Sequence, residues 1–377
     1  MNIQNSGYGY TSAGRQSAVR KKEGLTPLLQ QGKKKLPRQG ISRILIRGTN
    51  WVGDAVMTLP AVASVRTAYP RAHISILAKP LVSDVYKLFS SADEIIIYRK
   101  ELDTAPGVIR LARILRKKKF DAAILLQNAI EAAIIAFVAG VKIRAGYNSD
   151  GRGLLLTHSI KRTEKIKKAH HVAYYLEMVN ALGCPPVSQE MYLQAKINRV
   201  TAQSVLRTFI PLEEKPVAVI APGAIYGPAK RWFSERFATV ADNLKKDFDC
   251  RVILLGGGDD WGIAQQVREQ ASTDLINLAG KTTLREAIYL ISQSLLFIGN
   301  DSGLMHIAGA LNIPTVAVFG STNPVTTSPV GEKTIIVRKE VPCSPCLEKT
   351  CPTDFRCMDA VTVDDVLAAV HDILKRD

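Results

Sequence analysis

Short runs of aliphatic and β-branched residues alternate along this chain with longer stretches whose apolar residues recur at helical spacing. In the first half this pattern predicts strands at 42–48, 73–79, 92–98 and 121–126, and helices at 54–70 and 107–120. In the second half it predicts strands at 216–223, 250–257, 295–300 and 315–320, and helices at 234–248, 261–271, 284–294 and 302–311. Such alternation is typical of α/β folds with parallel sheets.

The alternation is interrupted once, by a polar, proline-containing stretch from Thr201 to Lys215. A chain of 377 residues also exceeds what a single hydrophobic core usually organises. We therefore predict two doubly wound, Rossmann-like α/β domains that face each other across a cleft. Their expected bounds are 41–205 and 206–358.

Charge is distributed unevenly. Residues 1–43 carry nine Lys or Arg against one Glu, which supplies +8 of the formal net charge of +16. Because residues 1–40 are rich in Gly, Gln and Ser, we predict a disordered basic tail. The tail is either simply solvated or attracted to anionic phospholipid. No nucleic-acid motif accompanies the charge, so nucleic acid is not expected as a partner.

Long apolar segments are missing from the sequence. The longest apolar run, 122–141, is broken by Gln127, Asn128 and Glu131, and the first forty residues contain no apolar signal-like core. Neither a membrane-spanning helix nor a secretory signal is therefore predicted, and a cytoplasmic location is expected.

The first strand-to-helix junction reads GTNWVGDAVMTLP. In open parallel sheets, ligands bind outside the carboxyl ends of the strands, so such junctions are where functional residues are expected. Gly48 and Gly53 permit a tight turn, and Asp54 begins the helix. The carboxylate either stabilises the helix N-terminus or serves as a general base.

The second junction reads APGAIYGPAKRWFSERF. Gly223 and Gly227 precede Lys230 and Arg231, and Ser234 is expected to cap the following helix. A lysine beside glycine-rich backbone is suited to neutralising phosphate charge, although a Lys-Arg pair on a surface loop is also common.

The third junction reads NDSGLMHIAGALNIPTVAVFGSTNP. Ser302 is a suitable N-cap, and Gly303 lets backbone N–H groups approach a ligand at a helix N-terminus that favours phosphate. Asp301 is expected to pair with a lysine or to accept ribose hydroxyls. His306 lies one turn further on and either reaches the ligand or packs in the core. We predict that a sugar nucleotide's diphosphate and ribose bind here; the glycines 256–258 are weaker evidence for a further junction.

Together, NWVGDAVMTLPAV, PGAIYGPAKRW and the third motif resemble the ADP-heptose:lipopolysaccharide heptosyltransferases of glycosyltransferase family 9, over residues 41–374. The resemblance implies a GT-B fold, whose C-terminal helix, here within 359–377, returns to the first domain. It also implies inverting transfer of a heptose from ADP-L-glycero-β-D-manno-heptose to the heptosyl-Kdo2-lipid A inner core. Catalysis would need no cofactor. The enzyme would work peripherally on the cytoplasmic face of the inner membrane.

Site residues follow from the same resemblance. Asp54, after Gly53, corresponds to the base that deprotonates the acceptor, and Lys230 corresponds to the lysine that contacts the donor phosphates. Asp301, Ser302, Gly303 and His306 correspond to the family's donor-binding element, and the second junction adds Gly223 and Arg231 as residues expected to bind the donor. Basic residues after strands of the first domain are expected to receive the acidic acceptor, namely Lys79, Arg99 and Lys100.

The stretch CSPCLEKTCPTDFRC contains Cys343, Cys346, Cys351 and Cys357. Four thiolates at this spacing bind zinc or an iron-sulfur cluster, form a redox-dependent disulfide loop, or remain free; all three interpretations stay open. The other cysteines, Cys184 and Cys250, are expected in the core. The DFD sequence at 247–249, although similar to a metal-binding D-x-D, is expected to be structural.

Two other functions compete with transfer to lipopolysaccharide. A related sugar-nucleotide enzyme, either a transferase with another donor or an epimerase, would need the same phosphate junctions. A non-catalytic module at a membrane surface would need only the basic charge.

Overall fold

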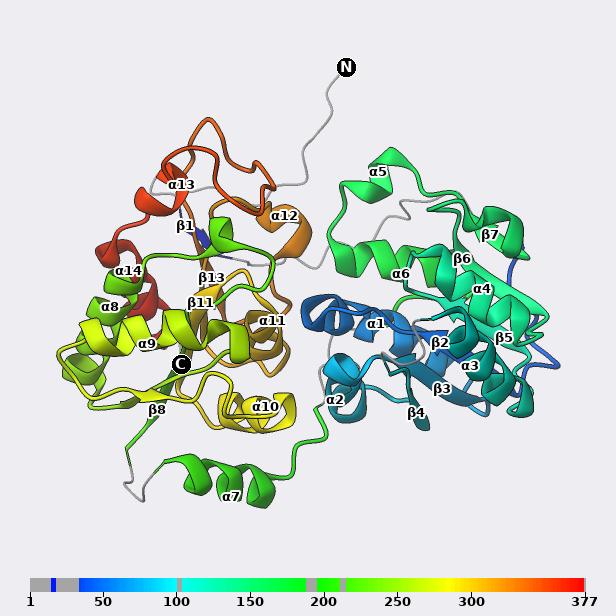
Figure 1. Ribbon diagram of the computed structural model, residues 1–377, viewed down its shortest axis with the longest axis horizontal. Coiled ribbons are helices and arrows are strands. Elements are labelled where there is room, and N and C mark those ends of the chain that lie inside the picture. The colour runs from blue at the N-terminus through cyan, green and yellow to red at the C-terminus, as the bar shows by residue number, and fades with distance from the viewer. Residues whose placement is uncertain (1–14, 18–33, 100–103, 188–194, 211–214, 376–377) are drawn as a thin grey trace. The chain divides into compact units, whose positions relative to one another are not determined.

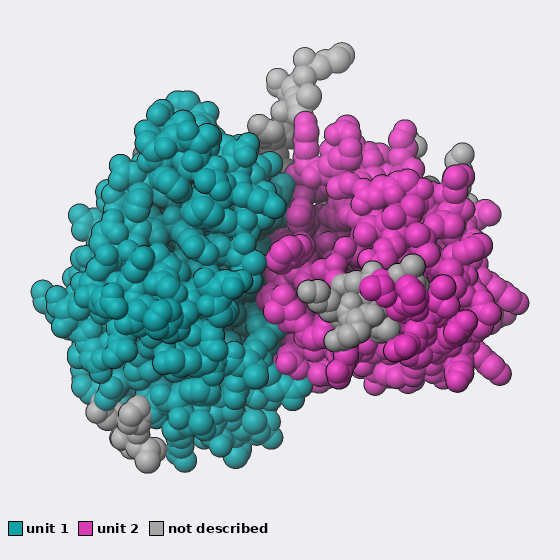
Figure 2. All heavy atoms as spheres, in the orientation of Figure 1, with its two compact units in different colours: residues 1–23, 197–377 teal, residues 24–196 magenta. Residues whose placement is uncertain are grey.

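The computed structural model describes residues 15–17, 34–99, 104–187, 195–210 and 215–375. The chain divides into two compact units, residues 24–196 (unit 2) and residues 1–23 with 197–377 (unit 1) (Figure 2). The division falls after Lys196, whereas the sequence places the domain boundary at 205–206. That expected boundary lies inside helix α7 (Arg199–Phe209), which packs on α10 (Leu284–Ser292) of unit 1, so the polar stretch is partly helical.

Unit 2 contains a six-stranded parallel sheet in the order β4-β3-β2-β5-β6-β7. With the strands numbered along the unit, this is the 3-2-1-4-5-6 order of Rossmann folds. The strands are β2 (Arg43–Arg47), β3 (His73–Ala78), β4 (Glu94–Ile97), β5 (Ala122–Leu125), β6 (Ile143–Tyr147) and β7 (His158–Ile160). The helices are α1 (Val52–Ala68), α2 (Pro80–Phe89), α3 (Ala105–Lys117), α4 (Ile130–Val138), η2 (Arg152–Leu155), α5 (Glu164–Lys167) and α6 (His171–Ala181).

Helices cover both faces of this sheet (Figure 1). On one face α3 and α4 pack together over a core that includes Leu45, Leu77 and Leu125. Helix α1 contacts both α2 and α6. Strand residues such as Ile44 are fully buried as well, because successive side chains of a strand point to opposite faces.

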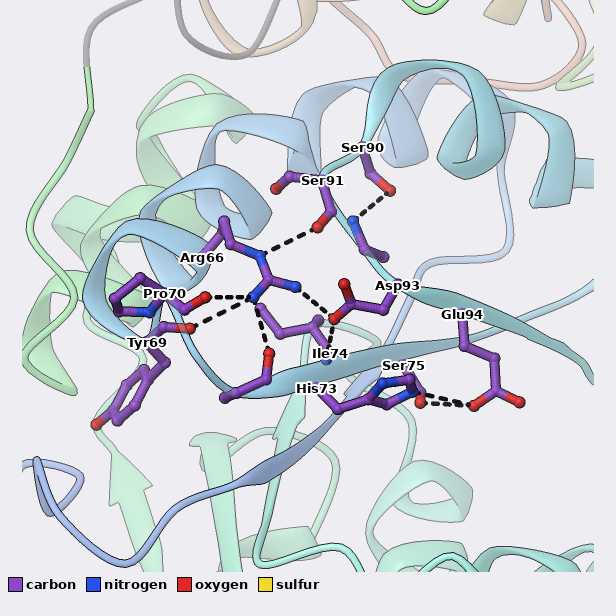
Figure 3. A network of polar contacts seen from close by, with 12 residues as sticks. Arg66, Tyr69, Pro70, His73, Ile74, Ser75, Ser90, Ser91, Asp93 and Glu94 are labelled. Atoms are coloured by element: carbon purple, nitrogen blue, oxygen red, sulfur yellow. Dashed lines mark hydrogen bonds and ion pairs between the residues drawn. The ribbon is translucent and has the colours of Figure 1, made fainter.

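At the amino ends of the strands, a polar network ties the end of α1 to the sheet (Figure 3). Arg66 donates to the carbonyl oxygens of Ser91, Pro70 and Ala72 and forms a 2.5 Å ion pair with Asp93. Asp93 also accepts a 2.7 Å hydrogen bond from the backbone N–H of Ile74. These contacts satisfy most of the donors on the guanidinium group, so the network holds elements together.

Unit 1 repeats the architecture. Its sheet has the order β1-β13-β12-β11-β8-β9-β10, in which the six parallel strands again follow the 3-2-1-4-5-6 order. The strands are β8 (Val217–Ala221), β9 (Arg251–Leu254), β10 (Ile276–Asn277), β11 (Leu296–Asn300), β12 (Thr315–Val318) and β13 (Thr334–Val337). The helices not yet given are η4 (Pro228–Lys230), α8 (Ser234–Phe248), η5 (Gly258–Asp260), α9 (Trp261–Gln270), α11 (Gly303–Ala310), α12 (Pro324–Thr327), α13 (Arg356–Asp359) and α14 (Val363–Leu374).

The C-terminal helix α14 belongs to the core of unit 1. Val366, Ala369, Val370 and Ile373 are buried among residues of α8, α9 and the central strands, and α14 contacts α8, β12 and β13. These contacts account for the apolar face of the helix within unit 1, and a return of the helix to the first domain stays a prediction. Its apolar face finds a complementary surface on the sheet that precedes it in the chain.

The predicted basic tail is described only in part. Strand β1 (Arg15–Ser17) pairs antiparallel with β13. Leu36 is 3% exposed and donates a backbone hydrogen bond to Leu182, while Arg38 donates to the carbonyl oxygen of Gly183. These segments depart from the predicted disorder because they find backbone partners. The basic residues 20–22 and 33 lie outside the described residues.

Among the described residues, no helix combines the length and the apolar character needed to cross a lipid bilayer.

Candidate functional site

Both sheets reverse their strand order at one point, which lies between β2 and β5 in unit 2 and between β8 and β11 in unit 1. Loops that leave neighbouring strands in opposite directions at such a point leave room for a ligand at the carboxyl edge. The predicted motifs follow β2, β8 and β11, three of these four strands.

In unit 2, Asp54 lies in the first turn of α1 with its side chain 28% exposed. Its Oδ1 atom is 3.5 Å from Nδ1 of His171, the first residue of α6. Trp51 occupies the N-cap position and makes no side-chain capping hydrogen bond. A carboxylate near the helix N-terminus, partly exposed and held by one long contact, retains acceptor capacity for a substrate hydroxyl.

The loop before Asp54 is fixed by Tyr86. A Cβ at Gly48 would lie 2.8 Å from the Tyr86 ring, so a side chain there would displace the tyrosine. Tyr86 also accepts a 3.1 Å hydrogen bond from the backbone N–H of Thr49. Burial raises the pKa of Tyr86, which keeps its hydroxyl protonated.

His171 lies next to a polar cluster that the motifs did not reveal, with its ring centroid 6.2 Å from that of Tyr174. Tyr174 exchanges hydrogen bonds with the Asn128 amide at 2.9 and 3.1 Å, and Tyr147 donates to the Tyr174 carbonyl oxygen at 2.8 Å. Arg152 is buried and donates to the Tyr147 carbonyl oxygen; burial lowers its pKa to about 10. The sequence signal was Asn128, which follows β5 in the same way that Asp54 follows β2.

Lys79 follows β3 and is the N-cap residue of α2. Its ammonium lies 5.5 Å from the Tyr98 ring centroid, and the guanidinium of Arg47 lies 5.3 Å from the same centroid. Two cations therefore gather at this edge of the sheet. Arg99 is exposed after β4, and Lys100 lies outside the described residues.

In unit 1, Lys230 and Asp301 form the closest charged contact of the site. Nζ of Lys230 is 2.7 Å from Oδ2 of Asp301, and the two side chains are 14% and 5% exposed. The pair joins the loop after β8 to the loop after β11 across the switch point. An ammonium has three donors, so this one keeps capacity for an anion beside it.

Asn300, at the end of β11, holds the same two loops together. Its amide donates to the Pro222 carbonyl oxygen at 2.7 Å and accepts from the Trp232 backbone N–H at 3.0 Å. The Trp232 indole donates to the Val361 carbonyl oxygen at 3.0 Å. Asn300, Trp232 and Val361 are buried. Their hydrogen bonds therefore fix the loop that carries Lys230.

Arg231 and Gly223 meet a carboxylate from the loop after β9. Asp260 is buried, and a Cβ at Gly223 would lie 2.1 Å from its side chain, so this approach requires glycine. Arg231 lies 3.6 Å from Asp260, whose pKa is raised by burial. The glycine run before Asp260 was a weak signal for this residue: the Gly257 N–H donates to it at 3.0 Å.

Ser302 is the N-cap residue of α11, as predicted, but its side chain makes no capping hydrogen bond. Its Oγ atom is inaccessible to solvent and has no hydrogen-bond partner among the described residues. Gly303 begins the helix and His306 is buried one turn on. A helix N-terminus with an unsatisfied hydroxyl is suited to a phosphate oxygen. Ser234 differs from prediction, since Phe233 is the N-cap residue of α8.

The cysteine segment supports the Lys230 loop through its backbone. The Lys349 carbonyl oxygen accepts from the Ala229 N–H at 3.1 Å, and the Leu347 carbonyl oxygen accepts from the Tyr226 hydroxyl at 2.9 Å. A Cβ at Gly227 would lie 2.2 Å from the Lys349 carbonyl oxygen. Tyr226 also contacts both lysines: Nζ of Lys230 and of Lys349 lie 4.9 and 5.8 Å from its ring centroid.

The predicted zinc or iron-sulfur site is not supported. Among the described residues, no three His, Cys, Asp or Glu side chains form a group that could hold a metal ion. Cys343 is exposed whereas Cys357 is buried, and all six cysteines are free. Cys184 and Cys250 are buried, as predicted. In the DFD stretch, Asp247 and Asp249 pair with His371 and Lys215, which agrees with a structural role.

The fold and the site define an α/β protein of two Rossmann-like units, with a Lys230–Asp301 pair at the strand junctions of one and an Asp54–His171 pair in the other. Residues 108–355 match the family described as glycosyltransferase family 9 (heptosyltransferase). The chain belongs to this family, and is a glycosyltransferase by that membership.

Several relatives share most of the chain's length. A lipooligosaccharide heptosyltransferase 2 of Haemophilus influenzae is 31% identical and aligns over 78% of this chain and 88% of its own. A lipopolysaccharide heptosyltransferase 2 of Escherichia coli is 29% identical over the same shares. The solved structure of E. coli ADP-heptose lps heptosyltransferase II superposes with a TM-score of 0.75 at 26% identity, covering 89% of this chain and 99% of that one. The fold prediction is thereby confirmed.

Proposed function

We propose that this protein transfers a heptose from ADP-L-glycero-β-D-manno-heptose to the heptosyl-Kdo2-lipid A inner core of lipopolysaccharide, with inversion at the anomeric carbon. The observation that carries the proposal is the buried Lys230–Asp301 pair at the switch point of a chain that belongs to the heptosyltransferase family. The names of its heptosyltransferase 2 relatives support the choice of donor and acceptor.

Unit 1 would bind the donor. The diphosphate would lie at the N-terminus of α11, where the helix dipole, the Ser302 hydroxyl and the ammonium of Lys230 all favour negative charge. Gly223 would allow close backbone approach, and Arg231 would add a second cation. Asp301 orients Lys230 and has an oxygen left to accept a ribose hydroxyl. His306 is buried in α11, so it would support the donor site from within the helix and would not contact the donor directly.

Unit 2 would supply the base. Asp54 accepts the proton of the acceptor hydroxyl while that oxygen forms the new bond to the anomeric carbon. The bond from that carbon to the diphosphate breaks at the same time, and its electron pair leaves with ADP. Lys230 and the α11 N-terminus stabilise the charge that develops on the leaving group. The Lys79 ammonium, near the same sheet edge, would attract the acceptor's phosphates.

The protein would act in the cytoplasm, in peripheral contact with the inner-membrane surface. Six free cysteines are compatible with a reducing compartment. The formal charge of +16 favours an anionic lipid surface.

One assay tests the proposed function. The purified protein is incubated with ADP-heptose and heptosyl-Kdo2-lipid A, and the lipid is analysed by mass spectrometry. A mass gain of one heptose, lost in Asp54→Asn and in Lys230→Met, is the expected result. Consumption of donor without any change in the lipid would instead indicate an epimerase or a hydrolase, and no consumption at all would indicate a binding module.

A further inference from the structure

The outer layer of unit 2 exposes an unusual set of aliphatic and aromatic side chains on α3, α4 and η2. We infer that this layer, here called the α3–α4 surface, docks the protein on an anionic lipid bilayer. The apolar members of the surface are Ile109 and Ile114 of α3, Ile130, Ile134 and Phe137 of α4, and Leu154 of η2. Helix α4 contacts both α3 and η2, so the three elements are neighbours.

Helix α4 shows why the pattern is not ordinary surface. Its inner face buries Ala133 and Ile135 against the sheet, as its amphipathic position requires. The opposite face carries Ile130, Ile134 and Phe137 at i, i+4 and i+7, with residue exposures of 44%, 37% and 53%. A helix between core and water normally places polar residues on that outer face. A row of exposed apolar residues indicates an interaction site.

The charge beside this row identifies the partner. Residues 105–119 contain six Lys or Arg and no Asp or Glu. Arg110, Arg113 and Lys117 are exposed on the same side of α3 as the two isoleucines. Arg144 lies over the Phe137 ring, with its guanidinium carbon 5.2 Å from the centroid. Apolar side chains interleaved with cations are typical of elements that lie in the headgroup region of anionic membranes.

Helices α3 and α4 together contain four Lys or Arg and one acidic residue, Glu131. Glu131 of α4 accepts a hydrogen bond from the Tyr98 hydroxyl, and Glu94 pairs with Lys118 at 2.5 Å. The cations that remain therefore face the solvent with little neutralisation. A second copy of this chain is a poorer partner, because a two-fold contact would set these arginines against one another.

The inference deepens the proposed function in one respect, since the acceptor proposed above is a membrane lipid. Docking through unit 2, the unit that carries Asp54, would keep the base close to the layer that contains the acceptor. The binding measurement itself uses no substrate, so failure of docking and failure of the transferase assay are distinguishable.

The test is co-sedimentation of the full chain with vesicles of phosphatidylcholine, with and without phosphatidylglycerol. We expect binding to the anionic vesicles that weakens with added salt. The double variants Ile134→Glu/Phe137→Glu and Arg110→Glu/Arg113→Glu should each lower the partition coefficient about tenfold or more. The matched control is Val200→Glu, on an exposed site of α7 in unit 1, which should bind like the wild type.

A conservative variant guards against loss of folding. Phe137→Trp keeps an aromatic ring in place, and its added indole emission should shift to shorter wavelength only with phosphatidylglycerol vesicles. An unshifted emission, or wild-type binding by both glutamate variants, overturns the inference. If Lys21→Gln/Lys22→Gln is the variant that loses binding and the glutamate variants keep it, the tail docks the protein and the inference is overturned. If the glutamate variants change only the oligomeric state, the surface binds a second copy and the inference is also overturned.

Discussion

The two edges of the sheet in unit 2 carry similar polar groups for different purposes. At the amino edge, His73 lies 3.6 Å from Glu94, and Arg66 and Asp93 complete a network of short hydrogen bonds. At the carboxyl edge, Asp54 has a single 3.5 Å contact with His171. A charged group whose hydrogen bonds are complete stabilises the fold, whereas one with spare capacity on a partly exposed edge is available to a ligand.

The largest effect should come from Asp54→Asn. The amide cannot accept the acceptor's proton, so kcat should fall about 1000-fold. The thermal unfolding midpoint should stay close to that of the wild type, because the carboxylate is partly exposed and makes one long contact. Lipid mass spectrometry and calorimetry measure the two quantities. Near-normal turnover in this variant would remove Asp54 from the mechanism.

Lys230→Met should affect both activity and stability. The value of kcat/KM for the donor should fall about 100-fold, because a cation on the leaving diphosphate is lost. Unfolding free energy should fall by about 3 kcal/mol, since Asp301 is 5% exposed and would lose its partner. The double variant Lys230→Met/Asp301→Leu is the control: it should regain most of the stability and none of the activity. If it regains activity, the pair is structural.

Arg66 lies on the same helix as Asp54, but Arg66→Ala should lower stability and leave activity unchanged, which is the opposite of the result expected for Asp54→Asn. Several carbonyl oxygens and the carboxylate of Asp93 lose their donor, so the unfolding free energy should fall by about 2 kcal/mol. The kcat of the folded enzyme should not change, because these contacts lie at the amino edge. Urea titration and the transferase assay test this, and a large loss of kcat at full folding would contradict the division between the two edges.

The two His–carboxylate pairs allow a direct comparison. His171→Asn should lower kcat about tenfold and alter the pH dependence of kcat, because this imidazole lies beside the proposed base. The other ionisable groups around His171 are Tyr174, Tyr175 and Arg162, and none of them is changed by this substitution. His73→Asn is the matched control and should leave the pH–rate profile unchanged. Equal effects of the two substitutions would show that neither is specific to catalysis.

The smallest effect should appear in acid. Burial favours the neutral form of Asp93, but hydrogen bonds from Ile74 N–H and Arg66 outweigh it, so its pKa lies below 3.8. A carboxyl group whose pKa is depressed by folding stabilises the protein above its unfolded pKa, and this contribution is lost as pH falls through the folded value. Denaturant titrations of wild type and Asp93→Asn should therefore converge in stability as pH falls below 3.8. A constant difference would show that the contact does not depend on charge.

Much of this molecule could be predicted from local pattern. Every strand and helix predicted from the alternation is present, with ends shifted by a few residues, because aliphatic runs and helical spacing encode local structure directly. The pattern predicts no helix at the positions of α2, α4 and α6, and at α7 it predicts only an interruption of the alternation. The helix in the polar stretch Thr201 to Lys215 packs on α10, which is distant in the sequence, so the residues of the stretch alone do not predict this contact.

Sequence by itself determined the alternating α/β architecture, the family resemblance and the junction residues Asp54, Lys230, Asp301 and Ser302. These depend on residue order, because the carboxyl end of each strand is fixed by the chain direction. Only the tertiary structure decided that Lys230 bonds to Asp301, that His171 lies beside Asp54 and that Asp260 fills the space at Gly223. It also decided that α14 packs on the sheet of unit 1 and that the four clustered cysteines form no metal-binding group among the described residues. Such contacts join segments far apart in the chain, and their geometry depends on how the whole core packs.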